Sequence, residues 1–234
     1  MKVIIFGATG MVGQGVLREC LLDPEVKRVL LVSRTPTTER HGKIREIIHH
    51  DFQDFTPIEA ELDGYDACFF TLGITSVGRS EADYRRVTYD ITLAAARVLS
   101  ARNPDLTFVY VSGTGTDNTE RGRVMWARVK GATENALLAL PFSAYMFHPG
   151  VVYSVHGEKS KTRWYRVVHT LTAPLSPLLL RLLPRLLVTT EQVGRAMLTV
   201  ARQGWPERFL SNRDLITAAG GRPQGMSGPR GGTP

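Results

Sequence analysis

The chain has 234 residues, of which 43% are hydrophobic, enough for a single α/β domain with a sizeable core. Its formal net charge of +7 comes from scattered basic residues, with no basic run interleaved with aromatics, which argues against a nucleic-acid-binding protein. The two cysteines, Cys20 and Cys68, lie in apolar contexts and are expected as buried thiols, so the expected location is a reducing cytoplasm.

The first predicted element is a short apolar strand at 3–6, which leads directly into a glycine-rich turn and a helix. In such a turn Gly7 lets the chain leave the strand tightly, Gly10 lets the backbone approach a pyrophosphate, and Gly13 lets the helix pack closely on the sheet. The helix N-terminus then faces the phosphates. The motif therefore predicts a dinucleotide site, with contacts from Gly7, Thr9, Gly10, Met11, Val12 and Gly13.

Apolar strands then alternate with helices along the chain. Further strands are predicted at 29–32, 46–50, 67–71, 106–111 and 143–147, and helices at 81–101, with Ser80 as the cap, and at 123–140. Strands that are apolar almost throughout and separated by helices are typical of a parallel sheet covered on both faces. The fold class is therefore α/β, a doubly wound parallel sheet of the Rossmann type.

The pattern changes after residue 150. Leu-rich residues 164–188 are interrupted by prolines and charges, and we expect short helices that form a small lid, with peripheral membrane contact as an alternative. A helix capped by Thr190, a strand at 208–210 and a helix at 212–219 follow in the sequence. The expected organisation is one nucleotide-binding domain over 1–220, which includes a substrate or lid region at 151–190, and a disordered tail at 221–234.

The end of the second strand indicates which nucleotide is bound. NAD-binding units of this type place an acidic residue there for the ribose hydroxyls, whereas this chain has Ser33 followed by Arg34. A guanidinium can hold a 2′-phosphate in a two-pronged charge-assisted pair. Ser33 and Arg34 therefore favour NADP(H) over NAD(H).

With strand ends at Leu72-Gly73 and Ser112 and a lysine at 130, the chain resembles the short-chain dehydrogenase/reductase superfamily. More narrowly, it resembles the atypical NmrA-like and nucleoside-diphosphate-sugar-epimerase-like members. The resemblance implies that the glycine motif binds the pyrophosphate. It also implies that the adenosine lies by Asp51, Phe52, Leu72 and Gly73, and that the nicotinamide lies by Pro149 and Gly150.

The same resemblance implies an active site from which one residue is missing. Active members use a serine after the fifth strand and a Tyr-x-x-x-Lys pair on the next helix, where the tyrosine transfers the proton. Ser112 and Lys130 match this pattern, but Trp126 stands at the tyrosine position. An indole N–H donates a hydrogen bond and exchanges no proton at accessible pH. Trp126 is therefore expected to line the substrate pocket together with Ser112, without acting as the acid.

A second departure is Thr88, which stands where many members carry an asparagine that relays protons. Tyr153, in the loop beyond the sixth strand, is the first candidate for a replacement proton donor. The other candidates are His148, Tyr89 and the Thr116-Asp117 pair. No metal site is expected, because the adjacent residues His49 and His50 point to opposite faces of a strand.

These observations leave two main hypotheses. The first is an NADP(H)-dependent oxidoreductase or epimerase-like protein that transfers hydride to or from a carbonyl or sugar-nucleotide substrate. The second is a non-catalytic NADP(H) sensor with a regulatory partner. Nucleic-acid or membrane binding ranks last. A homodimer through the helices at 81–101 and 123–140 is an expectation from the family resemblance.

Overall fold

The computed structural model describes residues 1–158 and 186–220. In this part of the chain, seven strands form one parallel sheet in the order β3-β2-β1-β4-β5-β6-β9. The strands are β1 (Lys2–Phe6), β2 (Arg28–Ser33), β3 (Ile44–Ile48), β4 (Ala67–Phe70), β5 (Thr107–Val111), β6 (Ser143–His148) and β9 (Phe209–Ser211). The central strands are buried almost throughout, as expected for parallel strands covered on both faces. The predicted doubly wound α/β fold is confirmed.

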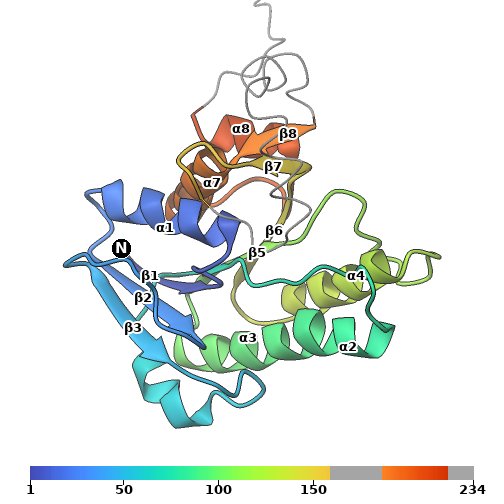
Figure 1. Ribbon diagram of the computed structural model, residues 1–234, viewed down its shortest axis with the longest axis horizontal. Coiled ribbons are helices and arrows are strands. Elements are labelled where there is room, and N and C mark those ends of the chain that lie inside the picture. The colour runs from blue at the N-terminus through green and yellow to red at the C-terminus, as the bar shows by residue number, and fades with distance from the viewer. Residues whose placement is uncertain (159–185, 221–234) are drawn as a thin grey trace, which may run out of the picture.

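Helices cover both faces of this sheet (Figure 1). One face carries α1 (Met11–Leu22) and α7 (Thr190–Gln203), and the other carries α3 (Ile91–Arg102) and α4 (Met125–Leu138). The short α8 (Asn212–Ala218) packs against α7. Because side chains alternate along each strand, Ile5 belongs to the core under α1 and Phe6 to the core under α3. The two faces therefore form two separate hydrophobic cores.

The helix predicted at 81–101 consists of three consecutive pieces. A short α2 (Glu81–Arg85) is followed by a π-helical turn, Arg86–Asp90, and then by α3. The predicted cap is present, because the Ser80 side chain accepts a hydrogen bond from the backbone N–H of Asp83. A 3₁₀ helix, Thr56–Leu62, lies between β3 and β4. The π turn contains the buried residue Thr88, and nothing in the sequence pattern predicts it.

Several predicted boundaries differ from those observed by one or two residues, and two of the differences have a structural reason. The third strand spans Ile44–Ile48 rather than 46–50, because it is an edge strand and is less buried than the strands whose apolar runs were easy to locate. The cap of α7 is Thr189 and not Thr190. The Thr189 hydroxyl accepts from the N–H of Gln192, and the Gln192 side chain accepts from the N–H of Thr189, which is a complete capping box.

A second, two-stranded sheet lies next to the carboxyl end of β6. It pairs β7 (Val151–Tyr153) with β8 (Leu187–Thr189) in parallel. Most of the lid predicted at 164–188 and the tail predicted at 221–234 lie outside the described residues. At the described end of the predicted lid, residues 187 and 188 are in a strand rather than a helix. Among the described helices, none combines the length and apolar character required to cross a membrane.

Candidate nucleotide and active site

The glycine turn between β1 and α1 is as tight as the sequence motif implies. Gly7 has a φ of +87°, and a Cβ built on it would lie 2.6 Å from the backbone nitrogen of Leu72. A Cβ on Gly13 would lie 2.1 Å from the carbonyl oxygen of Gly7. No larger residue fits at either position without movement of the backbone. Gly7 thus turns the chain beside β4, and Gly13 holds α1 against the turn.

The N-terminus of α1 carries the features required for an anion. Its N-cap is Gly10, which provides no side-chain cap, and its first turn contains no acidic side chain. The first N–H groups of the helix therefore keep their hydrogen-bonding capacity, and the helix dipole favours negative charge there. The N–H of Gly10 donates to the carbonyl oxygen of Gly7 at 2.9 Å, which fixes the turn. The turn and the helix end together fit the pyrophosphate of a dinucleotide.

The end of β2 places Arg34 in an exposed position. The preceding Ser33 is buried, and its hydroxyl donates to the carbonyl oxygen of Thr35 at 2.7 Å. The nearby carboxylate of Glu46 accepts from the N–H of Thr37 at 2.8 Å. Glu46 therefore holds the loop after β2 in shape, while the Arg34 guanidinium is left to solvent.

The residues expected around the adenosine lie in different environments. Asp51 is exposed, and its carboxylate accepts from the N–H of Gln53. Phe52 is 5% exposed, and its ring stacks on Phe55, so it contributes to the core beneath the site rather than to an open surface. Gly73 follows β4, and a Cβ built on it would meet no atom within 4 Å. The space beside Gly73 is therefore open.

Ser112 and Lys130 lie together at the carboxyl end of β5. The Lys130 ammonium donates to the carbonyl oxygen of Ser112 at 2.9 Å, and the Ser112 hydroxyl lies 2.9 Å from that of Thr116. Burial lowers the pKa of Lys130 to about 8, and the charge of Glu134 acts in the opposite direction. Trp126 lies one helical turn before Lys130. Its indole ring is next to Gly115, since a Cβ built on that glycine would lie 3.5 Å from the ring. Of the predicted active-site residues, Ser112, Trp126 and Lys130 thus lie at the carboxyl end of β5 and on the first turns of α4.

One residue behind this site, Glu134, was not predicted from the sequence. It is fully buried on α4, one turn beyond Lys130. One carboxylate oxygen lies 2.8 Å from Nε2 of His148, and the other accepts from Nδ2 of Asn118 at 2.7 Å. The four-residue spacing from Lys130 was the available signal. His148, one of the candidate proton donors, is thus tied to α4.

The nicotinamide side of the expected site is fixed by a buried asparagine that the sequence analysis also missed. Asn212 accepts from the N–H of Gly150 at 3.0 Å and donates to the carbonyl oxygen of Leu187 at 2.9 Å. Pro149 accepts from the N–H of Thr114 at 3.1 Å. The turn at 149–150 is therefore linked to the loop after β5, to β8 and to α8.

The candidate proton donors are in distinct places. Tyr153, expected in a loop, is 8% exposed and pairs within β7 with Thr189 of β8. Tyr89 lies on the π turn, where the Arg85 guanidinium sits over its ring at 3.9 Å. The Asp117 carboxylate accepts hydrogen bonds from within its own loop, chiefly from Thr119, and these lower its pKa. Asp117 therefore acts as a turn-forming residue.

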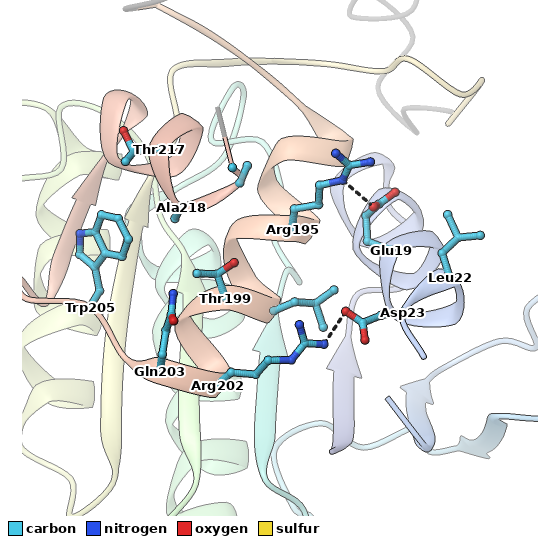
Figure 2. Close-up of a pocket in the computed structure, with 13 residues that line it drawn as sticks. Glu19, Leu22, Asp23, Arg195, Thr199, Arg202, Gln203, Trp205, Thr217 and Ala218 are labelled. Atoms are coloured by element: carbon cyan, nitrogen blue, oxygen red, sulfur yellow. Dashed lines mark hydrogen bonds and ion pairs between the residues drawn. The ribbon is translucent and has the colours of Figure 1, made fainter. Parts of the chain in front are cut away.

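A separate groove of about 630 Å³ lies among α1, α7 and α8, on the face of the sheet opposite α4 (Figure 2). Its charged side chains pair with one another across the helices. Arg195 bonds Glu19 at 3.1 Å, and Arg202 pairs with Asp23. These pairs hold α7 against α1 and make the groove a site of helix packing, distinct from the predicted nucleotide site.

Comparison with known proteins agrees with this geometry. The family model for the NAD dependent epimerase/dehydratase family matches residues 3–120. The chain is 30% identical over 166 residues to protein FMP52-1, mitochondrial, of Scheffersomyces stipitis, covering 70% of this chain and 71% of that protein. It is 26% identical to protein HTATIP2 of Rattus norvegicus, covering 70% of this chain and 67% of that protein.

Solved structures share the fold. The Bordetella bronchiseptica enzyme WbmF in complex with NAD⁺ and UDP superposes with a TM-score of 0.66 at 18% identity, covering all of this chain and 84% of that one. MoeE5 in complex with UDP-glucose and NAD gives a TM-score of 0.67 at 17% identity, covering 90% of this chain and 75% of that one.

The comparisons also correct one expectation. Several relatives are named as mitochondrial proteins, which contradicts the cytoplasmic location expected from the sequence. The expectation rested on Cys20 and Cys68, which are buried and unpaired. Such thiols indicate a reducing environment, and they do not identify the compartment that provides it. The family model and the relatives agree with the glycine turn and the parallel sheet, and the chain belongs to the NAD dependent epimerase/dehydratase family.

Proposed function

We propose that this protein binds NADP(H) in preference to NAD(H) and transfers hydride to or from a carbonyl or sugar-nucleotide substrate. The observation that carries the nucleotide preference is the exposed Arg34 at the end of β2, one strand away from the glycine turn. The carboxylate of Glu46, on β3, accepts from the N–H of Thr37 in the loop after β2. The exposed Arg34 therefore offers a cation to a 2′-phosphate.

The substrate class rests on the arrangement at the end of β5 and on the relatives. Lys130 and Ser112 are the groups proposed to hold the nicotinamide ribose and to orient the substrate oxygen. Solved structures of the same fold contain UDP or UDP-glucose with NAD, which supports a nucleotide-sugar or related carbonyl compound as the small-molecule partner. The helices α2, α3 and α4 are the proposed surface of a homodimer.

The second candidate function is a non-catalytic NADP(H) sensor, and Trp126 favours it. The indole occupies the position of the proton-transferring tyrosine and can only donate a hydrogen bond. In a sensor, cofactor binding would alter the affinity for a regulatory partner without turnover.

A nucleotide titration tests the nucleotide preference. Purified protein is titrated with NADPH and NADH, and energy transfer from tryptophan to the reduced nicotinamide is recorded. Trp126→Phe identifies the contribution of Trp126 by difference from the other two tryptophans, Trp164 and Trp205. We expect Arg34→Asp to weaken NADPH binding about 10- to 100-fold, the size of one lost charge-assisted bond, and to leave NADH binding unchanged.

The matched control is Arg28→Asp, which makes the same charge change at an exposed position at the opposite end of β2. Equal loss of NADPH binding in both variants would reduce the effect of Arg34 to general electrostatics. Equal affinity of the wild type for both nucleotides would refute the NADP(H) preference.

The two candidate functions are separated by turnover. A screen of carbonyl and sugar-nucleotide compounds that finds activity, lost in Lys130→Ala, supports the enzyme. No turnover in the wild type or in Trp126→Tyr, together with a protein partner retained only in the presence of NADPH, supports the sensor.

A further inference from the structure

We propose that Glu134 is a positioning residue of the nicotinamide site, where its buried charge keeps Lys130 protonated and its two oxygens tie the parts of the site to α4. This inference rests on the proposed nucleotide binding. Glu134 has no exposed surface, and both carboxylate oxygens accept from or contact side-chain nitrogen atoms. Burying a carboxylate costs free energy unless hydrogen-bond donors are supplied to it, and these partners face both of its oxygens.

The first partner of Glu134 is Asn118, in the loop after β5. Asn118 donates to the carboxylate at 2.7 Å, and its carbonyl oxygen accepts from Asn135 at 2.9 Å. The same loop lies directly on α4, since a Cβ on Gly131 would be 1.9 Å from the carbonyl oxygen of Asp117. The loop carries Ser112 at its beginning, so its attachment to α4 fixes that residue relative to Lys130.

The second partner is His148, at the end of β6. His148 precedes the turn at 149–150, and its imidazole lies 2.8 Å from Glu134. Because β5 and β6 pair with Val111 opposite Phe147, His148 lies beside Ser112 on the face of the sheet that α4 covers. One carboxylate thus links α4 to both strand ends that carry the expected site.

The charge of Glu134 also acts on Lys130. Two titratable groups act directly on Lys130: Tyr110 of β5, whose ring lies 5.4 Å from the ammonium, and Glu134. Three others lie beside their neighbours: Tyr84 of α2 near Tyr110, His148 of β6 on Glu134, and Asp117 of the loop on α4. Burial raises the pKa of both tyrosines, so they stay neutral. The Asp117 carboxylate accepts hydrogen bonds from the Thr119 hydroxyl and the N–H of Gly122. Glu134 is therefore the anion in this set that supports the Lys130 ammonium against burial.

The direct test is the titration of Lys130 in the unliganded protein. The Cε resonance of Lys130 is followed by ¹³C NMR against pH and assigned by its loss in Lys130→Arg. We expect a midpoint near pH 8 in the wild type. In Glu134→Gln the midpoint should fall by roughly one to two pH units, the order expected for two unit charges one helical turn apart in a protein interior. Gln keeps an oxygen and an N–H for the two partners and removes the charge alone.

Two further variants serve as controls. Glu134→Asp retains the charge and should titrate near the wild-type midpoint. Glu207→Gln makes the same chemical change at an exposed position and should leave the Lys130 midpoint unchanged. The same midpoint in the wild type and in Glu134→Gln overturns the proposal.

NADPH affinity provides the second measurement. The wild-type affinity should fall as the pH rises through about 8, because Lys130 loses its proton there. In Glu134→Gln this fall should occur at lower pH, so that binding is about tenfold weaker at pH 8 and near wild type at pH 6. An equal loss at every pH would reveal a purely structural role and overturn the charge role. A wild type that binds no nucleotide refutes the proposed function, while the NMR titration still decides the role of Glu134.

Discussion

The contact between Gly13 and Gly7 gives a prediction whose magnitude follows from the structure. In Gly13→Ala the new Cβ would lie 2.1 Å from the Gly7 carbonyl oxygen, more than 1 Å inside an ordinary contact. Overpacking against backbone costs about 3 kcal/mol, and the better helix propensity of alanine returns about 1 kcal/mol. We therefore expect a net loss of about 2 kcal/mol in the free energy of unfolding.

The assay is urea denaturation followed by circular dichroism, together with an NADPH titration. The displaced Gly7 carbonyl accepts from Gly10 at the N-terminus of α1, so nucleotide affinity should fall at least about tenfold with stability. Gly10→Ala is the matched control, since its Cβ would lie 3.3 Å from the same oxygen and should change stability by less than about 1 kcal/mol. If Gly13→Ala matched the wild type in both stability and affinity, the close packing of this turn would not explain its glycines.

Three further predictions concern substitutions at single residues. In Gly73→Ala the new methyl group meets no protein atom, so the free energy of unfolding should stay within about 1 kcal/mol of the wild type. Calorimetry should nevertheless show weaker nucleotide binding. Unchanged binding would contradict an adenosine at this position. Lys130 loses its proton near pH 8 in the folded protein and near pH 10.5 in the unfolded chain. The free energy of unfolding of the wild type should therefore rise by about 2 kcal/mol between these pH values relative to Lys130→Met. Parallel curves of unfolding free energy against pH for the two proteins would contradict this. Asn103→Ala should lower the free energy of unfolding, measured by urea denaturation, by about 2–3 kcal/mol. The reason is that the buried Asn103 side chain accepts from the N–H of Tyr65 and donates to the carbonyl oxygen of Leu62. A smaller loss would mean that water replaces the amide.

The sheet was predictable from the sequence because its strands are buried on both faces. The runs in β1, β2 and β4 are apolar without alternation, and the glycine turn after β1 fixes where the first helix begins. The strands β7 and β8 were not predictable, because a run of three residues has no measurable period. Their pairing depends on contacts far apart in the chain.

The site was predictable where a motif names the residue and not where burial defines it. Ser112, Trp126 and Lys130 stand in a recognisable spacing. Glu134 reads in the sequence as an ordinary polar residue of an amphipathic helix, since most glutamates face solvent. Only the packing of α4 against β5 and β6 shows that this carboxylate is enclosed.

The small sheet of β7 and β8 has a consequence for how this fold can change. The chain leaves the nucleotide-binding body after Val151–Tyr153 and returns at Leu187–Thr189, side by side with its point of departure. Because the two strands pair directly, the points at which the chain departs and returns are held together by a sheet of their own. Asn212 joins this junction to Gly150. A substitution that loosens β7 or β8 is therefore expected to disturb the turn at 149–150 before it disturbs the central strands of the main sheet.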